Sequence, residues 1–480
     1  MAMIAPNRPR QIVPDQQERK WIMTDYKRLL CRLGAVVVGF SSLMFSSVLV
    51  IAQEAVPLQP VREASISLPT FQEGEELSLD RVVAIAIQRQ PDILAAQGSI
   101  AVGQSRVGQA RSGFAPQVDG TVGLSRFSPD GSYANPSRSD ASYGRYTAGV
   151  TVNQMLYDFG KTATRVAIQE SSVNSFRADL ASVEDHVIFN AKVAFFDLLT
   201  LMRKMSVAVE TVTQFEKHRV QAQGFFDAGV KPKYDVTKAE VDLSNAKLNL
   251  IRAENGVRLG RVALSAAMGF SETPNYRVKD SLNFEQFPVV LEDAMVQAYD
   301  HRPDLKALLL RKKTAEQAVL LARKGDSPYL SGSVGASYGG DKFPLDEGWD
   351  VGVSLLVPVF NGNRTKHEVG EAEANLAVLA AKETGLRHQI YKEIQQGYLI
   401  LHEASERIIA SQLTVQQAEE NYAIASGRYE AGVGNPVEVA DADVLLSNAR
   451  TAHVEALYEY KIAQAAIERA IGVTTVPAVM

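Results

Sequence analysis

One segment of this chain occurs twice, and the two copies limit the folds that the rest can adopt. Residues 226–269 align without a gap to residues 429–472, which lie 203 positions later, and 14 of the 44 aligned pairs are identical. Each copy contains an Ala-Gly-Val turn between two long helical patterns, at residues 228–230 and 431–433. Self-similarity at a fixed offset indicates a duplicated structural unit, which here is a helical hairpin.

The segments that flank these turns have the apolar spacing of very long helices. Residues 162–226 contain no proline, and their apolar residues recur in alternating steps of four and three, as do those of residues 363–428. This spacing is the heptad seam of a coiled coil. The seam resumes after each turn, in residues 233–268 and 436–471. Each repeat therefore predicts an antiparallel helical hairpin whose first helix is roughly 100 Å long.

The duplication extends upstream of the hairpins, to about Leu77, where we expect ordered structure to begin. Arg302-Pro303-Asp304 follows Gln90-Pro91-Asp92 at an offset of 212 residues. Downstream of these two tripeptides, the spacing of apolar residues changes from a helical period to alternation. The four alternating runs span about residues 116–127, 144–157, 328–340 and 349–359. Strands of about 10 residues with one apolar face are typical of transmembrane β-barrels, although an ordinary half-buried sheet has the same pattern.

The N-terminal region has a different character. An apolar run from Leu33 to Ala52 follows several basic residues, which predicts a secretory signal peptide at residues 1–52. The run is also long enough for a retained membrane anchor. Because the basic region of a signal peptide is usually short, we expect translation to start at Met23. The only cysteine, Cys31, precedes the apolar run, which argues against a lipoprotein signal.

These patterns divide the chain into five regions. We expect a signal peptide at 1–52, a flexible leader at 53–76, a first repeat at 77–288, a second repeat at 289–472 and a short tail at 473–480.

Charge and motifs argue against nucleic-acid binding and catalysis. The net charge of −5 gives no electrostatic basis for binding nucleic acid. The chain has no Walker A loop, no dinucleotide-binding fingerprint and no His-Glu-x-x-His pair, and its seven histidines are scattered along the predicted helices. We therefore expect no enzyme activity, no cofactor and no metal site.

Acidic residues follow both turns. Asp235 lies just past the first turn, and Glu438 and Asp441 lie just past the second. Because Glu438 and Asp441 are three residues apart, they share one helix face. Acids in a first helical turn also complement the helix dipole, and this explains Asp235 and Glu438 better than Asp441. Both a functional and a purely structural interpretation remain open from the residues alone.

From Leu77 to Gly472, the order of these elements resembles the TolC-type outer-membrane factor family. The segments that carry the resemblance are Arg302-Pro-Asp304, Leu156-Tyr-Asp-Phe-Gly160, Val359-Phe-Asn-Gly362 and Arg428-Tyr-Glu-Ala-Gly432. The resemblance implies a mainly α fold with a membrane β-barrel. It also implies a homotrimer, in which four strands per chain join a twelve-stranded outer-membrane barrel and the duplicated hairpins form a periplasmic α-barrel.

The resemblance implies a function as well. The chain would be the passive exit duct of a tripartite efflux pump or a type I secretion system, in the outer membrane. Its partners would be a periplasmic adaptor and an inner-membrane transporter, while the cargo is not implied. The implied gate residues are Asp235, Tyr429, Glu438 and Asp441. The implied adaptor contacts are Ala228, Gly229, Val230, Ala431, Gly432 and Val433.

Two points limit this interpretation. Gly434 stands where the best-studied family pattern has an arginine that helps to close the gate, so closure here would depend on packing or on other polar bonds. The alternative function is that of a periplasmic or membrane-anchored coiled-coil spacer. That alternative explains the heptads and the apolar run, but not why strands with an apolar face occur once in each repeat.

Overall fold

The computed structural model describes residues 74–127 and 143–473. The predicted signal peptide, Met23, residues 53–73 of the predicted leader and residues 474–480 lie outside this part. Within the described ranges, no helix combines the length and hydrophobicity that crossing a membrane requires.

The two repeats contain the same succession of elements, which is two helices, two strands and a pair of long helices. The first repeat comprises α3 (Leu79–Arg89), α4 (Pro91–Arg111), the 3-10 turn η2 (Ser112–Phe114), β2 (Gln117–Phe127), β3 (Tyr143–Tyr157), α5 (Lys161–Asp227) and α6 (Lys233–Ala267). The second comprises α7 (Leu291–His301), α8 (Pro303–Arg323), β5 (Tyr329–Gly340), β6 (Asp346–Leu356), α9 (Arg364–Glu430) and α10 (Pro436–Ile471). Helices α5 and α9 have 67 residues each.

Two short strands join the beginning of the first repeat to the segment near its end, before the second repeat. Strand β1 (Glu76–Leu77) pairs in parallel with β4 (Arg277–Val278). The backbone N–H of Gly74 also donates to the carbonyl oxygen of Asn275 at 2.9 Å. Leu77, where the sequence predicts the first repeat to begin, therefore lies in a paired strand.

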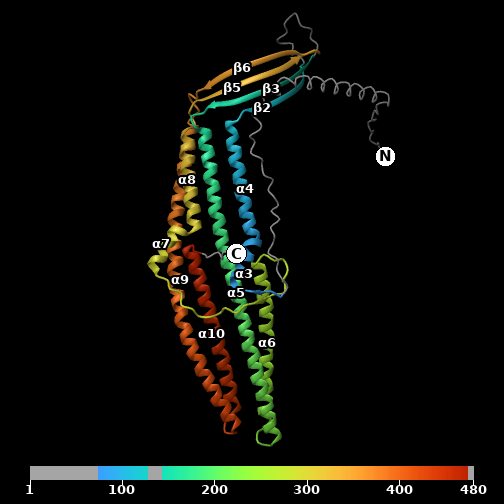
Figure 1. The fold of residues 1–480 in the computed structure, drawn as a ribbon, viewed down its shortest axis with the longest axis vertical. Coiled ribbons are helices and arrows are strands. Elements are labelled where there is room, and N and C mark those ends of the chain that lie inside the picture. The colour runs from blue at the N-terminus through green and yellow to red at the C-terminus, as the bar shows by residue number, and fades with distance from the viewer. Residues whose placement is uncertain (1–73, 128–142, 474–480) are drawn as a thin grey trace, which may run out of the picture. The chain divides into compact units, whose positions relative to one another are not determined.

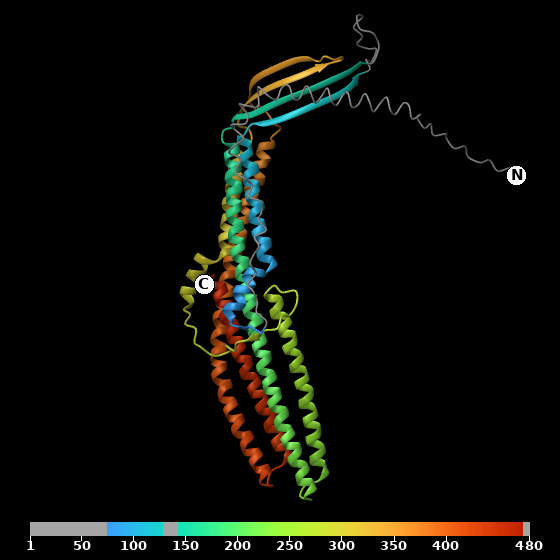
Figure 2. The ribbon, with the colours of Figure 1, turned by 45° about the vertical axis from the view of Figure 1, so that its right-hand side comes forward.

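The four long strands form one antiparallel sheet in the order β2-β3-β5-β6. Its register places Gly120 opposite Val150, Val150 opposite Ala336, and Ala336 opposite Trp349. The sheet lies beyond one end of the long helices, and the two helical turns lie at the other end (Figures 1 and 2). Strand β6 ends at Leu356, short of the alternating sequence, because Pro358 has no N–H to donate to the ladder.

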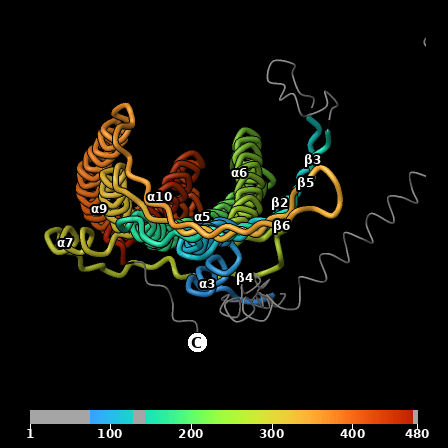
Figure 3. Tube along the Cα trace, turned by 90° about the horizontal axis from the view of Figure 1, so that it is seen from above, coloured from blue at the N-terminus to red at the C-terminus, as the bar shows by residue number. Residues whose placement is uncertain are grey.

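The long helices lie side by side in a row. Near the turns the order is α9, α10, α5, α6, so that α9 and α6 form the two edges (Figure 3). Nearer the sheet, α4 and α8 replace the return helices, and the order becomes α9, α8, α5, α4. No other long helix of the described residues lies beyond either edge of the row.

The main hydrophobic core lies midway along the long helices, where α3, α5, α7 and α10 meet. Phe195, Tyr276 and Tyr460 are among its largest buried side chains. The hydroxyl of Tyr460 donates to the carbonyl oxygen of Glu285 at 2.9 Å and accepts the N–H of Phe287 at 2.8 Å, which fixes the connection between the repeats. Toward the turns only two small buried clusters remain. The tip end therefore has less packing to resist motion than the middle.

Candidate functional site

Both tips end in a glycine with a left-handed backbone. The φ angle of Gly229 is 72° and that of Gly432 is 77°. In the first tip the N–H of Val230 donates to the carbonyl oxygen of Phe225 at 2.9 Å, and Val433 makes the equivalent bond at 3.1 Å in the second. These are the bonds of a Schellman helix end, which glycine permits because it has no Cβ to clash at positive φ.

The residues expected to contact an adaptor are all exposed at these tips. They are Ala228, Gly229, Val230, Ala431, Gly432 and Val433. The two valines are 61% and 72% exposed, which is unusual for apolar side chains held by a rigid turn. The tips touch each other through Lys231, whose Nζ lies 3.4 Å from the carbonyl oxygen of Gly434.

Gly434 is packed too tightly to carry a side chain in this tip conformation. A Cβ at this position would lie 2.7 Å from the backbone nitrogen of Tyr429 and 2.9 Å from the carbonyl carbon of Arg428. The backbone N–H of Gly434 donates to the carbonyl oxygen of Arg428 at 2.9 Å. An arginine at this position would therefore clash with the backbone of the second tip.

Tyr429 and Asp235, two of the predicted gate residues, line one small pocket between the hairpins. The pocket has a volume of about 20 Å³, which is room for one water molecule. Tyr429 is 1% exposed and packs edge-to-face on Phe225, with ring centroids 5.5 Å apart. Its hydroxyl has no hydrogen-bond partner among the described residues. Burial, followed by the nearby Asp235 carboxylate, raises the pKa of Tyr429.

The other two predicted gate residues, Glu438 and Asp441, lie on the exposed face of α10. Glu438 lies 3.8 Å from Arg428 in an ion pair whose partners are both more than half exposed. Asp235 and Glu438 are equivalent positions in the two repeats, yet only Asp235 is buried. The duplicated hairpins therefore present their acids in different environments.

A series of polar contacts that sequence reasoning did not identify joins α5 to α10 along the seam between the hairpins. The contacts are Lys192 Nζ to Glu468 at 2.6 Å, Lys204 Nζ to Glu455 at 2.6 Å, Thr211 Oγ1 to Ser447 Oγ at 3.2 Å, and Arg450 to Glu210 at 2.5 Å. Arg450 also bonds Glu419 of α9 at 2.8 Å, so one guanidinium links three helices. The first pair is the least exposed of the ion pairs in this series. These contacts join the two hairpins along the seam, and none of them involves position 434.

Asp443 of α10 lies fully buried in the same seam. It is 0% exposed, and neither carboxylate oxygen has a hydrogen-bond partner among the described residues. Burial, with a contribution from Glu210, raises the pKa of Asp443 to about 7. The heptad of Val439, Ala442 and Leu446 could have revealed this residue, because Asp443 directly follows a seam position.

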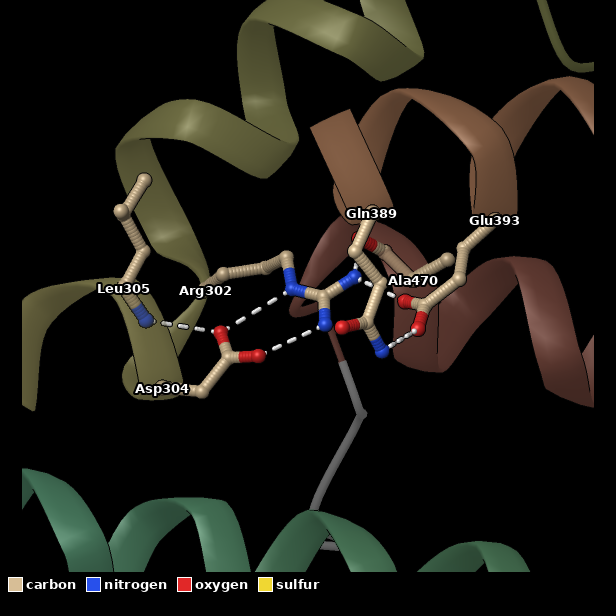
Figure 4. Close-up of polar contacts among 6 residues, drawn as sticks. All are labelled: Arg302, Asp304, Leu305, Gln389, Glu393 and Ala470. Carbon is tan, nitrogen blue, oxygen red and sulfur yellow. Dashed lines mark hydrogen bonds and ion pairs between the residues drawn. The ribbon is translucent and has the colours of Figure 1, made fainter. Parts of the chain in front are cut away.

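At the opposite end of α10, a buried arginine holds the return helix in place (Figure 4). Arg302 makes a two-bond ion pair with Asp304, at 3.0 and 2.7 Å, and a third bond with Glu393 of α9 at 2.5 Å. It also approaches the carbonyl oxygen of Ala470, near the end of α10, at 3.5 Å. Burial alone would raise the pKa of Asp304, but its bonds with Arg302 hold that pKa below the usual range.

The first repeat holds the end of its return helix at the equivalent position, but with an uncharged side chain; we call each of these two contacts an anchor. The side-chain amide of Gln90 donates to the carbonyl oxygens of Ala266 and Ala267, at 2.9 and 2.6 Å, at the end of α6. Gln90 and Arg302 are equivalent residues, as are Ala267 and Ala470. Each return helix is thus tied at its C-terminal end to the helix joint of its own repeat.

Within the described residues, no three His, Cys, Asp or Glu side chains come together as a candidate metal site. The polar groups instead lie along the seam and at the tips.

Comparisons with known proteins identify relatives of one kind, which are outer membrane proteins. The model of the family described as "Outer membrane efflux protein" matches residues 82–270 and 294–473, which is most of the chain. The chain is 21% identical over 395 residues to the outer membrane efflux protein BepC of Brucella suis, covering 81% of this chain and 83% of that protein. It is 22% identical to the outer membrane protein TolC of Escherichia coli, covering 76% of each.

The fold is similar to that of a solved outer membrane channel. The crystal structure of CmeC from Campylobacter jejuni superposes with a TM-score of 0.73 at 18% identity, covering 83% of this chain and 86% of that one. Long paired helices capped by a small antiparallel sheet are thus shared between the two structures.

Proposed function

The chain belongs to the outer membrane efflux protein family, and on this premise we propose that three copies of it form the exit duct of an efflux pump or a type I secretion system. The strands of the three copies would close a barrel in the outer membrane, and the helices would continue the duct into the periplasm. A periplasmic adaptor and an inner-membrane transporter would supply the cargo and the energy. The family is one of channels, so transport here requires a pathway rather than a catalytic centre.

The one-sided sheet carries this proposal. Its register gathers the large apolar side chains on a single face, and that face is exposed, with Trp349 81% exposed. The residues on this face are Val118, Val122, Leu124, Val150, Val334, Trp349, Val351, Val353 and Leu355. The opposite face has Asp119, Thr121, Thr151, Ser333 and Asp350. An apolar outside and a polar inside are what a barrel in lipid requires.

The unpartnered edges support the trimer. Among the described residues, strands β2 and β6 each lack a neighbour on one side, and an isolated sheet with open edges has unpaired backbone groups that lipid cannot satisfy. Three sheets of four strands would remove every edge, because the first strand of one copy would pair with the last of the next.

The helical row has matching edges. One face of α6 carries a stripe of exposed apolar residues. They are Val241, Leu248, Ile251, Leu259 and Val262. Others lie exposed along α9, at the opposite edge, and include Tyr391, Leu399, Ile409 and Leu413. We propose that α6 of one copy packs on α9 of the next, in a heterologous contact that closes after three copies.

For the gate, we propose that the tips of the three copies meet at the periplasmic end of the duct. Glu438 and Asp441 would then form two acidic rings that favour cations. Tyr429, packed against the first hairpin beside Asp235, would hold the second hairpin in the closed position. The exposed Ala-Gly-Val turns would meet the adaptor, because small residues let another backbone approach closely.

Fractionation with sizing of the native assembly tests this function. The duct predicts a trimer that is extracted from the outer membrane by detergent and that dissociates on heating. A monomer that stays in the inner membrane would support the coiled-coil spacer instead. The spacer is not favoured, because it leaves the apolar face of the sheet and the family match unexplained.

A further inference from the structure

Asp443 is a buried acid to which the gate described above assigns no role. Its side chain is completely enclosed by the seam between the hairpins, and both of its oxygens lack hydrogen-bond partners in the described part of the chain. The equivalent residue of the first repeat, Glu240, is exposed. The duplication therefore offers an acid at the same position in two environments, and only the second hairpin buries it.

Three ionisable groups interact with Asp443, which are Glu210 of α5, Tyr422 of α9 and Arg450 of α10. A second set surrounds these three: His218 and Glu430 interact with Tyr422, and Glu419 is bound to Arg450. On α6, Lys238 and Asp242 pair with each other at 3.0 Å beside the pocket that Val439 and Ala440 also line.

Arg450 attracts the Asp443 carboxylate, but burial outweighs this attraction and the pKa of Asp443 is still raised. The guanidinium of Arg450 is already bound by Glu210 and Glu419. The hydroxyl of Tyr422 lies 3.3 Å from Nε2 of His218, and burial lowers the pKa of that histidine, which favours its neutral ring. Burial, and then the charge of Asp443, raises the pKa of Tyr422 to about 12, so this hydroxyl also stays neutral.

An unpaired carboxylate in such a place is strongly unfavourable, whereas the neutral acid is tolerated. The packed seam therefore favours the protonated form of Asp443, and separated hairpins, in which water reaches the side chain, favour the ionised form. Burial raises the pKa of Asp443 to about 7 in the packed seam, against 3.8 for an unperturbed aspartate.

We propose that Asp443 is a proton-binding residue of the seam, protonated while the hairpins are packed together and ionised when they part, so that the pH of the periplasm regulates opening of the duct. This inference rests on the proposed function and names a regulation of it. Asp443 acts as a positioning residue. Its charge state sets how firmly α10 packs on α5, and its side chain does not contact the cargo.

The sign follows from the direction of the shift. Because the pKa of the acid is higher in the packed seam, that state binds more protons and is favoured at low pH. The preference weakens as the pH rises from about 4 to about 7, and then stays constant. Each unit of difference between the two pKa values changes the ratio of open to closed channels by up to about tenfold. Opening should therefore increase with pH across this window.

The first measurement is single-channel recording of the purified full-length assembly in planar bilayers between about pH 4 and about pH 7. For the unaltered protein we expect an increase in open probability of at least about tenfold across this range. Asp443→Asn keeps the shape of the side chain but cannot ionise. The part of the pH response that depends on residue 443 should therefore be lost in this variant over the same range. Glu240→Gln, the matched change at the exposed equivalent residue, should retain the response of the unaltered protein.

The second measurement follows the seam without using the channel. Thr211 Oγ1 and Ser447 Oγ are 3.2 Å apart on α5 and α10, so cysteines placed at both positions should form a disulfide when the seam is packed. The cross-linked fraction, divided at each pH by that of the same pair carrying Asp443→Asn, should fall as the pH rises. Asp443→Val serves as a second neutral variant if the asparagine variant does not assemble.

The two measurements separate the proposals. A protein that never conducts contradicts the duct, while the cross-linking ratio still tests Asp443. A pH response that is the same in Asp443→Asn and in the unaltered protein, in either measurement, overturns the role of Asp443. So does an unaltered protein whose cross-linking ratio stays constant across the range.

Discussion

Arg302 shows how one buried charge determines local structure in this chain. Its guanidinium has carboxylates on two sides, from Asp304 and Glu393, and a helix-end carbonyl close by (Figure 4). Such an arrangement leaves few donors unused, which offsets the cost of removing the charge from water. The result joins the start of α8 to α9 and to the end of α10.

Removing this charge should be costly. We expect Arg302→Ala to lower the free energy of unfolding by about 3–5 kcal/mol, because it leaves Asp304 and Glu393 without their partner. Arg323→Ala, at the far end of α8, breaks an exposed pair with Glu373 and should cost no more than about 1 kcal/mol. Urea unfolding of the detergent-solubilised protein measures both. Equal losses would show that Arg302 has no special structural role.

Tyr429 allows packing to be separated from hydrogen bonding at the tip. Because its hydroxyl is unpartnered in the described structure, Tyr429→Phe should change the stability by less than about 1 kcal/mol and leave the channel closed. Tyr429→Ala removes the ring that packs on Phe225, at a cost of about 3–5 kcal/mol for a fully buried aromatic, and should raise the conductance. If the phenylalanine variant conducts as well as the alanine variant, a hydroxyl bond and not the ring closes the gate.

At the scale of elements, the return helices α6 and α10 are each tied at the C-terminal end to a helix joint. Gly269 and Gly472 end these helices at positive φ, and each packs against the backbone of the helix joint in its own repeat. The close approach leaves no room for a side chain. The anchors thus require glycine on one side and Gln90 or Arg302 on the other.

Two glycines offer opposite outcomes for the same substitution. Gly472→Ala should cost at least about 1–2 kcal/mol, because φ is 76° and the new Cβ would lie 2.9 Å from the backbone nitrogen of Arg302. Gly98 lies within α4 with nothing within 4 Å of its Cβ position. Gly98→Ala should therefore stabilise the protein by about 0.5–1 kcal/mol. Thermal unfolding checks both signs, and stabilisation by Gly472→Ala would contradict the anchor.

The sequence contains the periodic features of these elements but not the contacts between them. Heptad spacing and the absence of proline indicate α5 and α9, and alternation indicates the strands, because each is a local pattern. The bonds of Arg302 to Glu393 and of Arg450 to Glu210 join residues that are far apart in the chain. No local period encodes them. The sequence shows that Gly434 differs from the arginine of the family pattern, but only the backbone geometry of the tip explains the glycine.

At the scale of the whole molecule, the unpartnered edges determine how copies can associate. The exposed apolar stripe of α6 and that of α9 lie on opposite edges of the row (Figure 3). An interface made of two different surfaces closes into a ring only if its rotation fits. The one-sided sheet at the other end must close by the same rotation.

A charge within the α6 stripe should therefore prevent assembly. We expect Leu248→Glu to reduce the trimer by at least about tenfold, because each of the three contacts would bury an unpaired carboxylate at a cost of several kcal/mol. Asn249→Glu adds the same charge to the next residue, which is also exposed, and should leave the trimer intact. Light scattering after size exclusion in detergent compares them. A stable Leu248→Glu trimer would place the interface elsewhere.

The central claim is that the second hairpin forms the mouth of a conducting duct, and bilayer recording tests it most directly. The unaltered assembly should conduct weakly and favour cations, because the acidic rings of Glu438 and Asp441 would line a narrow opening. The double variant Glu438→Ala with Asp441→Ala should lose this cation preference and conduct more readily. If its conductance and ion selectivity equal those of the unaltered protein, these acids do not line the mouth and the proposed gate is wrong.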